Sequence, residues 1–108
     1  MAIKKSLRKG TRYILFEQHY EKTPKNENEI INNIKKYIGL LEIPPLKIIY
    51  FDNKYGLIKT NENGLKKVIA SLILSSDEGN RIETLDSSGT IKSIIERNSQ
   101  LKEKIKKN

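Results

Sequence analysis

Few side chains in this 108-residue sequence could carry acid–base chemistry. His19 is the sole histidine, and Glu17 and Glu21 are the acids nearest to it along the chain. Acid–base catalysis needs a second group within hydrogen-bond reach of the first, and alternate positions on one strand do not by themselves supply it. We therefore expect His19 to be a strand residue with a polar tip, and we expect no metal site.

Two polar loops offer weaker chemistry. Asp77 and Glu78 stand among Gly and Ser residues without the spacing of metal ligands, which is typical of a turn. The run Ser87–Thr90 could present backbone N–H groups to a phosphate, although a helix N-cap explains it with fewer assumptions. Glycine-rich nucleotide loops are absent, and so is cysteine. The sequence therefore predicts no catalytic residue and no cofactor in this chain.

Positive charge is concentrated at the two ends of the sequence. The net charge is +8, with +5 in residues 1–12 and +4 in residues 92–108, which leaves −1 between them. Basic ends favour a polyanion such as RNA, DNA, an anionic membrane or an acidic protein, and they also occur as solvated tails. No apolar run approaches the roughly 18 residues of a membrane span. We expect a cytoplasmic protein without a membrane partner.

Apolar periodicity indicates four strands and three helices. The first strand, 12–20, carries Tyr13 and Leu15 on one face and Ile14 and Phe16 on the other, as in a central strand covered on both sides. A helix then begins at an Asn26–Glu29 capping box and ends before Pro44, and strands 47–51 and 55–60 flank a turn at 52–54. The next helix is capped by Asn61 or Asn63, and its apolar stripe is Leu65, Val68, Ile69, Leu72 and Ile73. A strand over 81–85 follows, and then a helix capped by Ser87 or Ser88.

This order predicts an α+β, ferredoxin-like β-α-β-β-α-β sandwich with an extra C-terminal helix. Residues 1–98 form one domain, and 99–108 are expected to be a basic, flexible tail. Two helices would cover one sheet face, and the extra helix or a partner would cover part of the other.

The third strand has the outline of the aromatic motif with which RNA-recognition modules stack bases. Only Tyr55 keeps an aromatic ring there, because Leu57 and Thr60 stand at the other aromatic positions. We therefore expect weak reading of single-stranded RNA by the sheet. Its apolar face suits protein packing better, and the predicted partner-binding residues are Tyr13, Leu15, Tyr55 and Leu57.

Three stretches resemble a known family. They are Arg12–Ile14 with Phe16, the block Gly56–Leu72, and Ser88–Lys92. Their order and spacing resemble protein component 2 of archaeal ribonuclease P, over residues 7 to about 97. The resemblance implies a non-catalytic subunit of an endoribonuclease whose RNA, with a divalent metal such as magnesium, removes the 5′ leader of precursor tRNA.

The resemblance also implies partners. These are ribonuclease P RNA and protein component 3, in pairs that double into heterotetramers, with precursor tRNA contacted indirectly. On this view basic side chains neutralise RNA phosphates. The predicted RNA-binding residues are Lys4, Lys5, Arg8, Lys9, Arg12, Lys92 and Arg97.

Three other interpretations remain. A ribosomal or ribonucleoprotein assembly protein of the same fold would bind RNA without needing the apolar sheet face. A small phosphatase of the acylphosphatase type would need an anion-cradling loop, but the end of the first strand is acidic at Glu17 and Glu21. A protein-interaction adaptor would bind its partner even with both basic ends removed.

Overall fold

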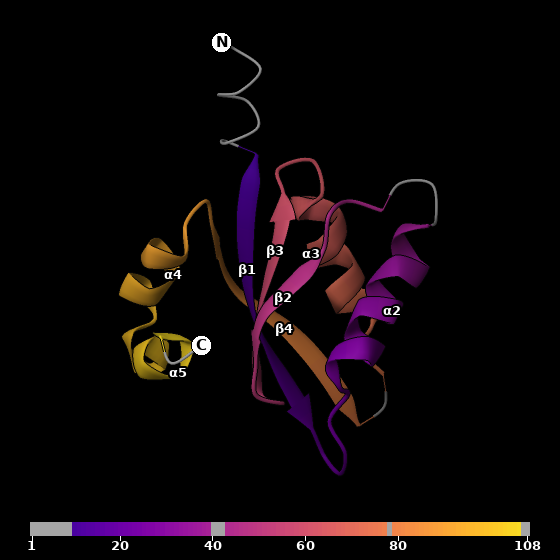
Figure 1. Ribbon diagram of the computed structural model, residues 1–108. Helices are drawn as coiled ribbons and strands as arrows, with labels where there is room; N and C mark the ends of the chain where they lie inside the picture. The colour runs from indigo at the N-terminus through magenta and orange to yellow at the C-terminus, as the bar shows by residue number, and fades with distance from the viewer. Residues whose placement is uncertain (1–9, 40–42, 78, 107–108) are drawn as a thin grey trace.

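A four-stranded antiparallel sheet is the framework of the computed structural model, which describes residues 10–39, 43–77 and 79–106. The strand order is β2-β3-β1-β4. The strands are β1 (Thr11–Tyr20), β2 (Lys47–Phe51), β3 (Tyr55–Asn61) and β4 (Asn80–Ser88). The helices are α2 (Glu27–Ile38), α3 (Leu65–Leu74), α4 (Ile91–Arg97), the 3-10 turn η2 (Ser99–Leu101) and α5 (Lys102–Lys106) (Figure 1). The predicted ferredoxin-like α+β fold is confirmed.

Helices α2 and α3 cover one face of the sheet (Figure 1). The predicted capping box starts α2: Asn26 accepts a hydrogen bond from the Glu29 backbone, and Glu29 accepts one from the Asn26 backbone. The resulting core contains Ile14, Phe16, Ile30, Ile34, Ile58, Val68, Leu72 and Ile82. Ile73 is an exception to the predicted stripe and is 56 % exposed, because it lies about 140° around α3 from the buried Val68.

The C-terminal helices cover the opposite face of the sheet (Figure 1). Leu101 and Ile105 lie four residues apart, so they share one side of the segment and bury against Leu15 and Leu57. This differs from the flexible tail expected over 99–108, because two apolar side chains at helical spacing suffice to dock the segment. The structure thus places the chain's own helices over this face.

Gly56 allows β3 to approach the large core side chain Phe16. The two residues are direct partners across the β1–β3 ladder. A Cβ atom at position 56 would lie 2.2 Å from the Phe16 ring, far inside van der Waals contact. The glycine that helped to mark the family resemblance is therefore explained by packing.

Candidate nucleic-acid interface

One end of the sheet collects basic side chains from several elements. Because β1 and β3 are antiparallel, Thr11 at the start of β1 lies beside Asn61 at the end of β3. The basic residues 1–9 precede Thr11, so they are attached at this end. The exposed lysines at the start of β2, near the end of β3 and early in α3 are Lys47, Lys59, Lys66 and Lys67.

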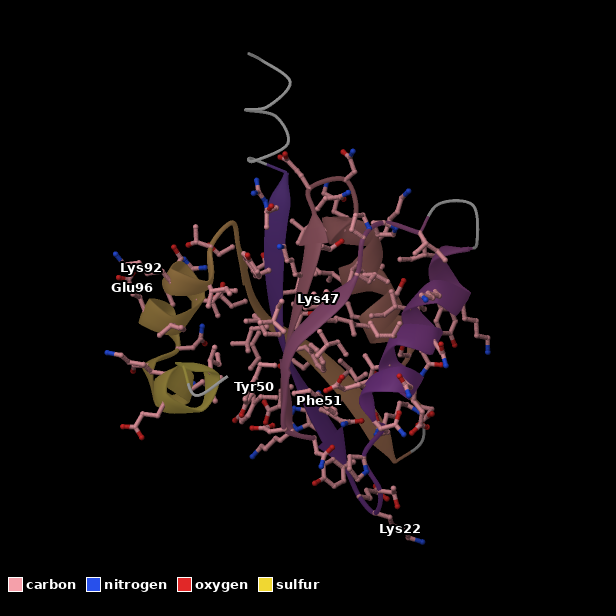
Figure 2. The ribbon with its side chains drawn as sticks, viewed as in Figure 1. Lys22, Lys47, Tyr50, Phe51, Lys92 and Glu96 are labelled. Atoms are coloured by element: carbon pink, nitrogen blue, oxygen red, sulfur yellow. The ribbon has the colours of Figure 1, made fainter. Side chains whose placement is uncertain are left out.

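Lys47 and Lys59 form the centre of this interface. They are direct partners across the β2–β3 ladder, so their side chains project from the same face. Like charges directly opposite each other are destabilising, and a phosphate between them would offset that repulsion. Both lysines line a shallow pocket at the edge of the sheet, and Figure 2 labels Lys47 on β2. The other lining residues are Gly10, Thr11, Pro45, Leu46, Thr60 and Asn61.

Sequence reasoning missed this pair because a bulge creates it. Next to the hairpin turn, Phe51 lies opposite Gly56. Continued without interruption, that register would place Lys47 opposite Thr60. The structure has a register shift between Ile48 and Tyr50, which brings Lys47 opposite Lys59 instead. The sequence predicts the hairpin, but it does not predict the bulge.

The predicted RNA-binding residues occupy several environments. Lys4, Lys5, Arg8 and Lys9 lie outside the described residues. Arg12 is partly buried, donates to the Thr11 carbonyl and pairs with Glu62 at 3.4 Å. Lys92 is exposed near the start of α4 (Figure 2), which follows the end of β4 beside Tyr13. Arg12 and Lys92 thus lie at the basic end of the sheet.

Arg97 fastens α4 to β4. Its Nε and Nη2 donate to the two carboxylate oxygens of Asp86 at 3.0 and 2.9 Å, and Nη2 also donates to the Ser87 carbonyl. Asn98 donates a further bond to Asp86. The hydrogen bonds from Arg97 hold the pKa of Asp86 below its usual value. The geometry assigns Arg97 a structural role, and its predicted contact with RNA stays a prediction.

Replacing Asp86 with asparagine should lower stability in a pH-dependent way. The depressed pKa of Asp86 means that its contribution is fully present above the unfolded pKa, about 3.9, and is lost as the pH falls through the folded value. The urea midpoint of Asp86→Asn should therefore lie below wild type at pH 7, with a smaller gap near pH 3. The exposed Glu96 on α4 provides a control, and an equal effect of Glu96→Gln would contradict the assignment.

The predicted partner-binding residues lie on the face beneath the C-terminal helices. Leu15 and Leu57 are fully buried there, whereas Tyr13 and Tyr55 keep partial exposure. A partner could touch Leu15 or Leu57 only if α4 and α5 moved away. The same covering blocks base stacking at the position of Leu57. The partner contact itself stays a prediction.

The loop from Ser87 to Thr90 acts as a helix start. Thr90, not the expected Ser87 or Ser88, is the N-cap of α4, and its Oγ1 accepts a hydrogen bond from the Ser93 backbone. The other polar loop is held by an ion pair in which Lys25 Nζ lies 3.0 Å from Asp77. Glu78 falls outside the described residues. The described residues of the two loops gather no set of groups suited to catalysis.

Comparisons with known proteins agree with this fold. Within the described ranges, no helix is both long and apolar enough to cross a membrane. A chain in the cryo-electron microscopy structure of yeast ribonuclease MRP is similar in fold, with a TM-score of 0.61 at 14 % identity over 85 % of this chain and 93 % of that chain. Curated proteins give no significant match. The sequence model of the Rpp14/Pop5 family matches residues 12–98, and the chain therefore belongs to this family of ribonuclease P and MRP protein subunits.

Proposed function

We propose that this chain is a non-catalytic RNA-binding subunit of ribonuclease P. The exposed Lys47–Lys59 pair carries the proposal, because it lies at the end of the sheet to which the basic residues 1–9 are attached. Several lysines on a rigid sheet edge, joined to a basic segment, suit the repeating phosphates of folded RNA. The role is electrostatic and architectural: the side chains neutralise phosphates and favour the compact form of the RNA.

The finer assignment is to the protein component 2 type found in archaea. In that assignment the chain pairs with protein component 3, and two such pairs form a heterotetramer on ribonuclease P RNA. The RNA, with magnesium, cleaves the 5′ leader, and this chain contacts precursor tRNA only indirectly. The motif residues at Arg12–Ile14, Gly56–Leu72 and Ser88–Lys92 support this type, and the cytoplasm is the proposed compartment.

A ribonucleoprotein assembly role is the second candidate. The same basic end of the sheet would bind ribosomal RNA equally well, because phosphate contacts carry no sequence information. The covered sheet face also favours this candidate over a partner-dependent adaptor, since Leu15 and Leu57 already have their apolar contacts within the chain.

Cleavage of precursor tRNA tests the proposal directly. Ribonuclease P RNA and component 3 are combined with and without this chain at low magnesium, where folding of the RNA is limiting. Dependence of cleavage on the chain supports the subunit assignment. Unchanged cleavage, together with binding to structured RNA, would instead favour the assembly role.

A further inference from the structure

Three side chains of types that can bind a metal ion converge at the end of β1 opposite the basic end of the sheet. Glu17 and His19 are two residues apart on β1, so they project from the same face of the strand. Glu83 is the direct partner of Glu17 across the β1–β4 ladder. The fold thus adds to His19 a carboxylate 64 positions away, which no local pattern in the sequence could supply.

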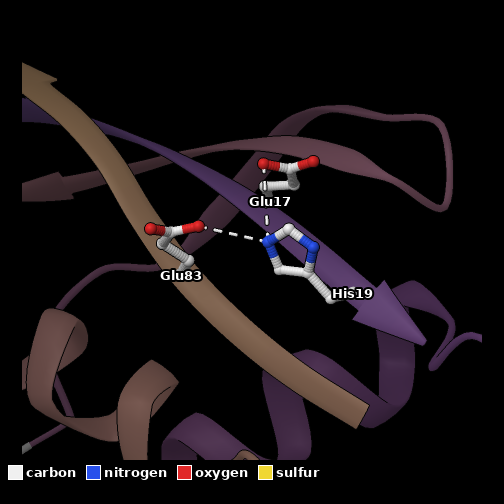
Figure 3. A group of neighbouring side chains, drawn as sticks. All are labelled: Glu17, His19 and Glu83. Carbon is white, nitrogen blue, oxygen red and sulfur yellow. Dashed lines mark hydrogen bonds and ion pairs between the residues drawn. The ribbon is translucent and has the colours of Figure 1, made fainter.

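The three side chains meet at one nitrogen of the His19 ring (Figure 3). Nε2 lies 3.1 Å from Glu83 Oε1 and 3.5 Å from Glu17 Oε1, and the three donor atoms all lie within 4.8 Å of one another. Donors about 2.1 Å from a tetrahedral zinc ion are about 3.4 Å apart. The observed separations to Nε2 lie on either side of that value, and the two carboxylate oxygens, within 4.8 Å of each other, would approach to that distance around an ion.

The environment suits a cation. Glu17 and Glu83 place two negative charges directly opposite each other in the ladder, which is unfavourable without a positive group between them. Lys54 Nζ lies 3.9 Å from the other carboxylate oxygen of Glu17, so it offsets only part of this charge from one side. The Glu17 side chain is only 15 % exposed, whereas His19 and Glu83 are 37 % and 49 % exposed. An ion can therefore enter from solvent.

We propose that Glu17, His19 and Glu83 form a binding site for a divalent first-row transition-metal ion such as Zn²⁺, which joins β1 to β4. One imidazole and two carboxylates form a mixed nitrogen and oxygen donor set, which zinc and its neighbours accept and which magnesium does not favour. Three protein ligands leave a coordination position for water or another small ligand. The site is separate from the basic end of the sheet, which is proposed to contact RNA.

Zinc titration of the full chain tests the site without RNA. His19 is the only histidine, so its two ring nitrogens give one pair of NMR signals. Zn²⁺ should shift the Nε2 signal, saturating at one equivalent, and raise the melting temperature. Glu83→Gln and Glu17→Gln should each weaken binding at least tenfold, as measured by competition with a chelating indicator. Mg²⁺ at the same concentration should shift nothing.

A matched variant separates the site from nonspecific binding. Glu21→Gln removes one acid next to the end of β1 but none of the three ligands, so it should bind zinc as wild type does. Without metal, Glu83→Gln should melt no lower than wild type, because it removes a repulsion. A ring signal unmoved by millimolar Zn²⁺, or equal zinc affinity in wild type and Glu83→Gln, would overturn the proposal. The first result would leave His19 as an ordinary bridge between two carboxylates.

Discussion

Replacing Lys47 and Lys59 together with alanine is expected to weaken binding to ribonuclease P RNA roughly tenfold or more at physiological salt. The two ammonium groups share one face, and each phosphate neutralised contributes roughly 0.7 to 0.9 to the slope of log affinity against log salt. The double variant should therefore lower that slope by about 1.5. Binding measured over a series of salt concentrations gives both quantities.

The chain offers a matched control for this change. Lys22, just after β1, and Lys54, in the β2–β3 turn, are exposed at the opposite end of the sheet, and their replacement with alanine alters the net charge equally. Only a small loss of affinity is expected from that variant. Arginine at both positions 47 and 59 should restore binding. Equal losses from the two lysine pairs would mean that net charge alone, and not the Lys47–Lys59 pair, drives association.

Replacing Gln18 with leucine is expected to lower the free energy of unfolding by about 3 kcal/mol or more. Gln18 is 1 % exposed, and its side-chain amide makes four hydrogen bonds. Its oxygen accepts from the Lys25 backbone and the Asn80 side chain, and its nitrogen donates to the carbonyls of Asn53 and Lys25. Leucine would leave these groups without their hydrogen-bond partner. Urea unfolding measures the loss.

This amide joins four separate parts of the fold. It connects β1 to the segment before α2, to the β2–β3 turn and to the start of β4, so its loss should loosen the end of the sheet that carries Glu17 and Glu83. Gln100 provides the control: it is exposed in η2, and Gln100→Leu should change stability by less than about 0.5 kcal/mol. A similarly small effect of Gln18→Leu would show that the buried amide contributes no net stability.

Much of the fold could be predicted because it depends on local patterns. The alternation in β1 correctly separated Tyr13 and Leu15 from Ile14 and Phe16, which lie in the two different cores. The Asn26–Glu29 capping box placed the start of α2. Side chains repeat every 2 residues in strands and every 3.6 in helices, so the sequence states which residues share a face. It does not state what covers that face.

The docking of the C-terminal segment shows this limit. Leu101 and Ile105 stand among four lysines in 99–108, and so little apolar content is typical of a disordered tail. The apolar side chains on this face of the sheet decide otherwise, because the packing of Leu101 and Ile105 also buries Leu15 and Leu57. A short apolar signal becomes meaningful only when its complementary surface is known.

The sequence by itself determined the order of the helices and strands, and which β1 side chains lie on each face of the sheet. It also determined the family resemblance and the positive charge at both ends of the chain. Only the tertiary structure decided which charged groups meet: Lys47 with Lys59, Glu83 with His19, and Asp86 with Arg97. The physical reason is register. Local periodicity fixes the face on which a side chain lies, but its cross-strand partner depends on bulges and long-range packing, and a shift of one residue changes every pair.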